Sequence, residues 1–145
     1  MSNTDVLRDS EADLLPPGYA RHIFTLNVGE YQGKAEVDGF NANTFEAIEI
    51  NQSETTGVAP KPGQKRKLAS DVLKLIFLKQ LGLISRGRVF ISSREMYTWC
   101  HQTGSWLNAA TRHYGITIEL KEHDNKRMRK KVRHALSNAR KENHA

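Results

Sequence analysis

Residues 92–120, SSREMYTWCHQTGSWLNAATRHYGITIEL, carry the clearest secondary-structure signals in the chain. Ser92 and Glu95 have the spacing of a capping box, in which each side chain bonds a free backbone amide at the start of a helix. The helix that follows places Met96 and Trp99 on one face. The stretch therefore predicts a short amphipathic helix with a sharply defined beginning.

A tight turn and a second short helix follow the first. A Gln-Thr-Gly sequence predicts the turn, after which Ser105 is expected to cap a helix that ends at Gly115. Within this helix Leu107 and Tyr114 recur at helical spacing, so we expect both to face inward. Residues 116–120, ITIEL, alternate between two faces and predict a strand.

The segment upstream is the most apolar in the chain. Residues 68–82 place apolar side chains around most of a helix of about four turns. Residues 88–91, RVFI, then predict a short strand. Because the two later helices have narrow apolar faces, they cannot bury these faces alone, and we expect both to dock onto the helix over 68–82.

The order of these elements over about residues 68–122 resembles a winged helix-turn-helix domain. The string SRGRVFISSREM at 85–96, followed by a basic C-terminal helix, is similar to origin-binding proteins of plasmids and phages and to small transcription regulators. The resemblance implies an α+β fold in which a winged helix-turn-helix domain inserts one helix into the DNA major groove. A small, partly β, acidic N-terminal region is expected to precede this domain.

Charge is distributed unevenly along the chain. Residues 1–60 contain ten acidic and three basic residues, a balance of −7, whereas residues 61–145 contain six acidic and nineteen basic residues, a balance of +13. The total is +6. This asymmetry predicts a half that binds a polyanion. We expect the acidic half to contact a protein partner, a second subunit or the chain's own basic face.

Composition suggests four segments. Residues 1–18 are acidic and end in Pro-Pro-Gly, which favours a flexible arm, and residues 19–51 form a small β-rich region. Residues 52–67 have the composition of a basic Pro/Gly linker. Residues 68–145 form the predicted winged helix-turn-helix domain with its basic C-terminal helix.

The candidate DNA contacts fall into three groups. Base reading is assigned to the residues expected on the outer face of the second short helix, because Asn and Arg bond adenine and guanine bidentately: Trp106, Asn108, Arg112 and His113. Contacts to the DNA backbone are assigned to Ser105 and to flanking cations: Arg86, Arg88, Arg94, Lys126, Arg127, Lys130, Lys131 and Arg133. A flexible linker arm along the backbone is assigned to Lys65, Arg66 and Lys67.

The sequence therefore predicts a sequence-specific protein that binds double-stranded DNA, most simply as a homodimer. Its role would be transcription regulation or the binding of an origin or partition site in a mobile element. We expect no enzymatic activity, cofactor, metal or membrane contact, and a cytoplasmic, nucleoid-associated location. The single cysteine excludes an internal disulfide.

Two alternatives remain open. An RNA-binding protein would use the same basic surface. A metal-dependent nuclease would use Glu119 and Lys121, which resemble the second half of an Asp…Glu-x-Lys site. In such a site the carboxylates hold Mg²⁺ and the lysine polarises the attacked phosphate. This alternative needs a preceding Asp on an adjacent strand, and before Glu119 the basic half offers only Asp71, inside a predicted helix.

Overall fold

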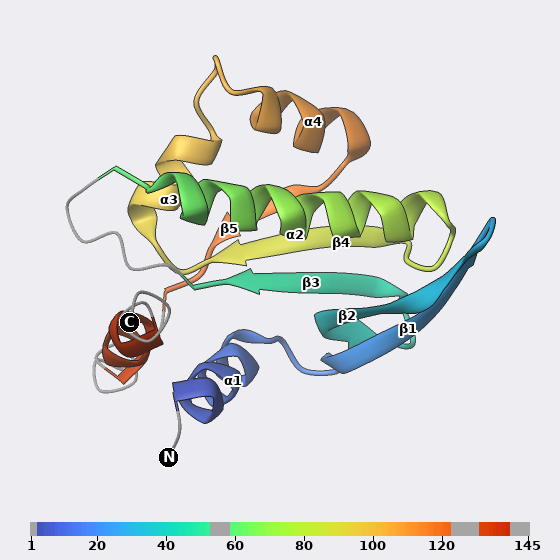
Figure 1. The fold of residues 1–145 in the computed structure, drawn as a ribbon, viewed down its shortest axis with the longest axis horizontal. Coiled ribbons are helices and arrows are strands. Elements are labelled where there is room, and N and C mark those ends of the chain that lie inside the picture. The colour runs from blue at the N-terminus through green and yellow to red at the C-terminus, as the bar shows by residue number, and fades with distance from the viewer. Residues whose placement is uncertain (1–2, 53–58, 123–130, 140–145) are drawn as a thin grey trace.

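A computed structural model describes residues 3–52, 59–122 and 131–139 of the chain. Its centre is one mixed sheet whose strands lie side by side in chain order (Figure 1). The strands are β1 (Ala20–Val28), β2 (Tyr31–Asn41), β3 (Glu46–Asn51), β4 (Arg86–Ile91) and β5 (Thr117–Leu120). The first three strands pair antiparallel, whereas β3, β4 and β5 pair in parallel. The α+β class is therefore confirmed.

Helices cover both faces of this sheet. They are α1 (Asn3–Leu14), α2 (Pro62–Gln80), α3 (Arg94–Cys100), α4 (Trp106–Tyr114) and a further helix over residues 131–139. The long helix α2 lies along β3 and β4, with α3 and α4 beside it (Figure 1). In the part of the chain that the structure describes, no helix has the length and apolar character needed to cross a membrane.

The core follows from the alternation of side chains along β3 and β4. On one face Ala47 and Val89 pack against apolar residues of α2, among them Leu75. On the other face Ile48 and Phe90 pack against residues that follow α1. At Gly87 an added Cβ would lie 3.1 Å from Leu75 Cβ, so the glycine allows α2 to lie close against β4.

Several local predictions are confirmed, and others shift by a few residues. Ser105 caps α4, and Gly115 ends it in the left-handed conformation with a φ of 71°. The cap of α3 is Ser93, one residue later than predicted, and its hydroxyl accepts from the Met96 amide at 3.2 Å. Helix α2 begins at Pro62, six residues before the predicted start.

The division of the chain into separate regions is not what the structure shows. Strand β3 pairs in parallel with β4, so residues 19–51 and residues from 68 onward share one sheet and one core. The proposed arm contains helix α1, whose Ser10 is fully buried. The last residues of the proposed linker, from Pro62 onward, are helical and form the start of α2. Pro62 does not prevent this, because proline is tolerated in the first turn of a helix.

Strands β4 and β5 also differ from the strands of a wing. A wing is an antiparallel hairpin, whereas β4 and β5 run parallel and are joined by α3 and α4. Ion pairs join the acidic half to the basic half, among them Arg86 with Glu46 at 3.9 Å and Lys74 with Glu49 at 3.1 Å. Part of the acidic half therefore neutralises the chain's own basic residues.

Candidate functional site

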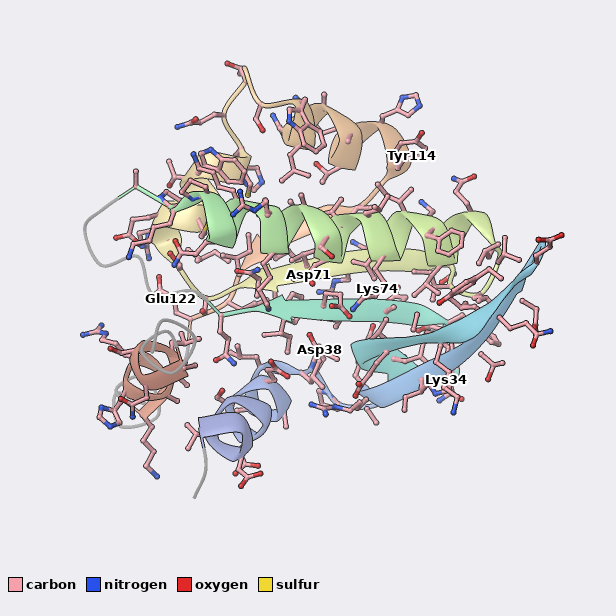
Figure 2. All side chains as sticks on the ribbon, viewed as in Figure 1. Lys34, Asp38, Asp71, Lys74, Tyr114 and Glu122 are labelled. Carbon is pink, nitrogen blue, oxygen red and sulfur yellow. The ribbon has the colours of Figure 1, made fainter. Side chains whose placement is uncertain are left out.

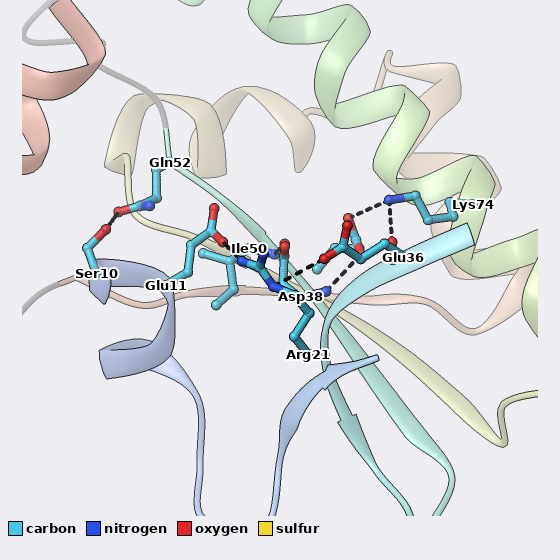
Figure 3. Close-up of polar contacts among 9 residues, drawn as sticks. Ser10, Glu11, Arg21, Glu36, Asp38, Ile50, Gln52 and Lys74 are labelled. Carbon is cyan, nitrogen blue, oxygen red and sulfur yellow. Dashed lines mark hydrogen bonds and ion pairs between the residues drawn. The ribbon is translucent and has the colours of Figure 1, made fainter. Parts of the chain in front are cut away.

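The most unusual local feature of the sheet is the place where β2 separates from β3. Ladder pairing between these strands covers only Gly39–Asn41 and Glu46–Ile48. Beyond it, carboxylates replace the ladder bonds (Figure 3). The Ile50 amide donates to Asp38 Oδ2 at 2.7 Å, and the Asp38 amide donates to Glu49 Oε1 at 3.3 Å. Two carboxylates from adjacent strands are thereby held side by side.

Helix α2 contributes two more ionisable groups to this place. Figure 2 shows Asp71 and Lys74 on the side of α2 that faces the strands. Lys74 Nζ lies 3.1 Å from Glu49 Oε2 and 2.9 Å from the Glu36 carbonyl oxygen. The Asp71 carboxylate accepts a hydrogen bond from the side-chain amide of Asn51 at 3.5 Å.

Helix α1 closes the site from the other side (Figure 3). Glu11 lies 3.6 Å from Arg21, and Ser10 donates a 2.9 Å hydrogen bond to Gln52. We call Glu11, Asp38, Glu49 and Asp71 the acid cluster. Its members come from four elements, and the fold alone brings them together.

Burial makes the charges of the acid cluster costly. Glu49 is 3% exposed, and burial, followed by the charge of Asp38, raises its pKa to about 8 despite the opposing effect of Lys74. Burial and then Asp38 raise the pKa of Glu11 to about 7. Burial likewise raises the pKa of Asp71. Glu49 and Glu11 are therefore poised to lose protons near neutral pH.

Lysine side chains supply only part of the balancing charge. Burial lowers the pKa of Lys74, but the charge and hydrogen bond of Glu49 outweigh it, so the pKa is raised and the amine stays protonated. Lys67 acts at longer range and lowers the pKa of Glu11 and Asp71. Arg21 is shared, because it lies 3.6 Å from Glu11 and 3.2 Å from Glu36, so it balances Glu11 only in part. An added cation would relieve the remaining repulsion.

The carboxylates are not arranged as a finished metal centre. Within the described ranges, no three Asp, Glu, His or Cys side chains form a group that could hold a metal ion. The oxygens of Asp38 and Glu49 point instead at backbone amides and at Lys74. Since a carboxylate has about four acceptor positions, each group retains capacity to bind a cation after a small rearrangement.

Further cations lie at the same end of the molecule. Helix α2 begins next to the end of β3, and its first turns carry Lys65, Arg66 and Lys67 (Figure 1). These are the residues predicted to form a linker arm. The ammonium of Lys65 lies 5.1 Å from the centre of the Trp99 ring, and Arg66 and Lys67 are exposed. Of the three, Lys67 is close enough for its charge to act on Glu11 and Asp71.

The predicted base-reading residues lie on α4, away from the acid cluster. Trp106 is 73% exposed, and Arg112 and His113 are also exposed. The prediction that Asn108 faces outward is wrong, because it is only 9% exposed and its side chain donates to the Gln102 carbonyl at 3.4 Å. Tyr114, expected to face inward, is 41% exposed.

Three of the predicted backbone-contacting arginines are paired with carboxylates. Arg94 lies 2.8 Å from Glu122, Arg88 lies 2.7 Å from Glu119, and Arg86 forms the longer pair with Glu46. Ser105 uses its hydroxyl to cap α4. Of the basic C-terminal residues, Lys131 and Arg133 are exposed on the helix over 131–139. Lys126, Arg127 and Lys130 lie outside the described residues.

Glu119 and Lys121, the residues of the nuclease alternative, lie on the face of the sheet opposite α2. Arg88 makes two hydrogen bonds to Glu119 and thereby lowers the pKa of that carboxyl. The ammonium of Lys121 lies 5.4 Å from the centre of the Phe90 ring. Phe90 belongs to the face opposite α2, so the sheet separates these residues from Asp71 and Lys74 of α2.

The acid cluster predicts an unusual dependence of stability on pH. Glu49 and Glu11 have pKa values of about 8 and 7 in the folded chain, above the ordinary 4.5. The folded state therefore binds more protons than the unfolded state across this range, and stability falls as pH rises from 4.5 through about 8. We expect thermal unfolding to show a lower Tm on the alkaline side. Glu49→Gln should flatten this slope, and an unchanged slope would contradict the assignment.

Comparison with models of known protein families, with curated proteins and with solved structures found no match to this chain. Its function is therefore argued from the residues of the site.

Proposed function

We propose that this protein is a divalent-metal-dependent nuclease that cleaves phosphodiester bonds at the acid cluster. The observation that carries the proposal is Glu49, a carboxyl 3% exposed beside Asp38 on the adjacent strand. A buried pair of like charges is costly for a fold. Perturbed carboxyls of this kind gather at functional sites, where a cation or a proton is exchanged.

Each group has a distinct part in the proposed reaction. A divalent cation would polarise a phosphoryl oxygen and make bound water more acidic. Asp38 and Glu49, two carboxylates from adjacent strands, are the groups that would hold it. Lys74 positions Glu49 through their 3.1 Å contact. Lys67, near the start of α2, is available to neutralise the phosphate.

Nucleic acid is the substrate that the surrounding charge favours. Exposed cations at the start of α2 lie next to the acid cluster, within a half of the chain that carries a balance of +13. Basic side chains bind the phosphate backbone with little regard to sequence and make affinity fall with salt. This proposal keeps the expected nucleic-acid partner but departs from the expectation of a protein without catalytic residues or metal.

The proposal is tested by incubating the full chain with supercoiled plasmid, single-stranded DNA and RNA. Each is assayed with Mg²⁺, with Mn²⁺ and with EDTA. We expect nicks or cuts that require the metal and weaken at high salt. Absence of cleavage of all three substrates with either metal would contradict the proposal.

A second candidate function is sequence-specific binding of duplex DNA, as a homodimer, in transcription regulation or at an origin or partition site. The observation in its favour is that α4 presents Trp106, Arg112 and His113 to the surface. Selection from a random duplex library with Arg112→Ala tests it. A defined motif, blurred by this variant and bound without cleavage, would favour this function over the nuclease.

A further inference from the structure

The outer face of α4 carries exposed aromatic side chains. Trp106 is 73% exposed, and His113, also exposed, follows seven residues later. Two full turns of helix separate these positions, so they lie on the same side of α4, about 10 Å apart along its axis. Ala109, exposed between them, has a small side chain that leaves room beside each ring. We call Trp106, Ala109 and His113 the α4 stripe.

The α4 stripe takes no part in the packing of the helix. The buried residues of α4 are Leu107, Asn108 and Thr111, on the opposite side, where the helix contacts α2 and β5. Next to the stripe the rings of His113 and Tyr114 lie edge to face, with centroids 4.9 Å apart, and Tyr114 is 41% exposed. Three aromatic rings are thus gathered on the surface of one short helix. Because an exposed indole adds little to the stability of the fold, this grouping points to contact with another molecule.

The charge around the stripe favours an anionic partner. No aspartate or glutamate occurs between Glu95 and Glu119, a stretch that includes the whole of α4 and the turn before it. Arg112 is exposed beside the stripe, and Lys79 donates a 2.9 Å hydrogen bond to the Tyr114 carbonyl at the end of α4. Aromatic rings among cations, without carboxylates, match a strand that has negative phosphates and flat bases.

The exposed groups favour a single strand over a duplex. A duplex offers base edges in its grooves, whereas stacking covers the faces of its bases. Asn108, the side chain of α4 best suited to base edges, is only 9% exposed and donates to the Gln102 carbonyl. The exposed side chains of α4 are instead aromatic rings, which stack on unpaired bases of any sequence.

We propose that the α4 stripe binds single-stranded nucleic acid. One base stacks on Trp106 and another on His113, and Arg112 binds the phosphate backbone. Helix α4 and the first three strands lie on opposite sides of α2, so the stripe is apart from the acid cluster (Figure 1). The inference goes beyond the nuclease proposal and does not depend on it, because stacking on these rings requires no metal.

The test is a fluorescence-anisotropy titration of the full chain, in EDTA, with a labelled single-stranded DNA of mixed sequence. The RNA of the same sequence and the DNA duplex are titrated in parallel. EDTA prevents metal-dependent cleavage, so failure of the nuclease proposal leaves this result intact. We expect both single strands to bind, with affinity that falls as salt rises, and the duplex to bind more weakly. Absence of binding of both single strands, or tighter binding of the duplex, would overturn the proposal.

Three variants locate the binding. Trp106→Ala should weaken single-strand binding by about tenfold or more, without loss of Tm because the indole is exposed. Trp106→Phe keeps a stacking ring, so it should retain most of the affinity but lose the quenching of tryptophan fluorescence that we expect when wild type binds. Tyr31→Ala removes an aromatic side chain that is 54% exposed on β2, and as the matched control it should leave binding unchanged. Binding insensitive to Trp106→Ala, or weakened equally by Tyr31→Ala, would overturn the proposal.

A second copy of the chain is the competing occupant of the α4 stripe. Sedimentation of the wild type and of Trp106→Ala, without nucleic acid, distinguishes the two occupants. We expect the same mass for both chains. A dimer that forms in the wild type but not in Trp106→Ala would assign the stripe to contact between copies and overturn the proposal.

Discussion

Replacement of Glu49 by Gln is expected to lower metal-dependent cleavage by about a hundredfold or more, while nucleic-acid binding is retained. The amide has nearly the same shape as the carboxyl but cannot carry the charge that holds a divalent cation. In the proposed function, nucleic acid would be bound mainly by exposed cations at the start of α2, which the substitution does not touch. Cleavage and binding are measured on the same substrate, the latter in EDTA.

Glu119→Gln is the matched control for this prediction. Glu119 also lies on a strand, two residues before Lys121, but the structure pairs it with Arg88 on the other face of the sheet. We expect Glu119→Gln to cleave at the normal rate. Loss of cleavage in Glu119→Gln with normal cleavage in Glu49→Gln would move the active site to the face with Lys121.

The second large effect is expected on stability. Leu75 is fully buried where α2 packs on β4, so Leu75→Ala removes core contacts and leaves a cavity. Such changes cost about 2–5 kcal/mol of unfolding free energy. Leu73 lies on the same helix but is 66% exposed, and Leu73→Ala should change stability by less than about 0.5 kcal/mol.

Denaturant unfolding, followed by tryptophan fluorescence and by circular dichroism, measures both variants. Because β3 and β4 share a sheet, the two probes should report one transition, shifted together in Leu75→Ala. Equal effects of the two substitutions would contradict the packing of α2. Two separate transitions would instead favour the division into independent regions suggested by composition.

Local signals in the sequence account for most of the second half of the fold. Helix caps act over three or four residues, so Ser105 and Gly115 could be assigned from neighbouring residues alone. The pairing of β3 with β4 joins residues about forty positions apart, and no local pattern reports it. The charge contrast between the halves then suggested two regions where there is one sheet.

The candidate site is likewise assembled from residues far apart in sequence, which no local pattern reports. Nothing in the local sequence marks Asp38, Glu49 or Glu11 as site residues, because charged residues are common in polar strands and helices. One sequence signal was available: in Glu46–Asn51, EAIEIN, a second glutamate interrupts an otherwise apolar run. The strand is buried on both faces, so that glutamate had to be buried too.

The error at Asn108 has a different physical cause. Helical spacing placed Leu107 correctly in the core, but it assumed that α4 buries one narrow face. The helix contacts both α2 and β5, and this wider contact also covers Asn108 and Thr111. Arg112 and His113 remained on the exposed side, as predicted.

The most direct test of the proposed active site is a titration with Mn²⁺, followed by electron paramagnetic resonance, of the wild-type chain and of Asp38→Asn. We expect the wild type to bind the ion, Asp38→Asn to bind it at least about tenfold more weakly, and Glu119→Gln to bind it normally. Absence of binding to the wild type, or equal binding by wild type and Asp38→Asn, would contradict the assignment of the acid cluster as a metal-dependent catalytic site.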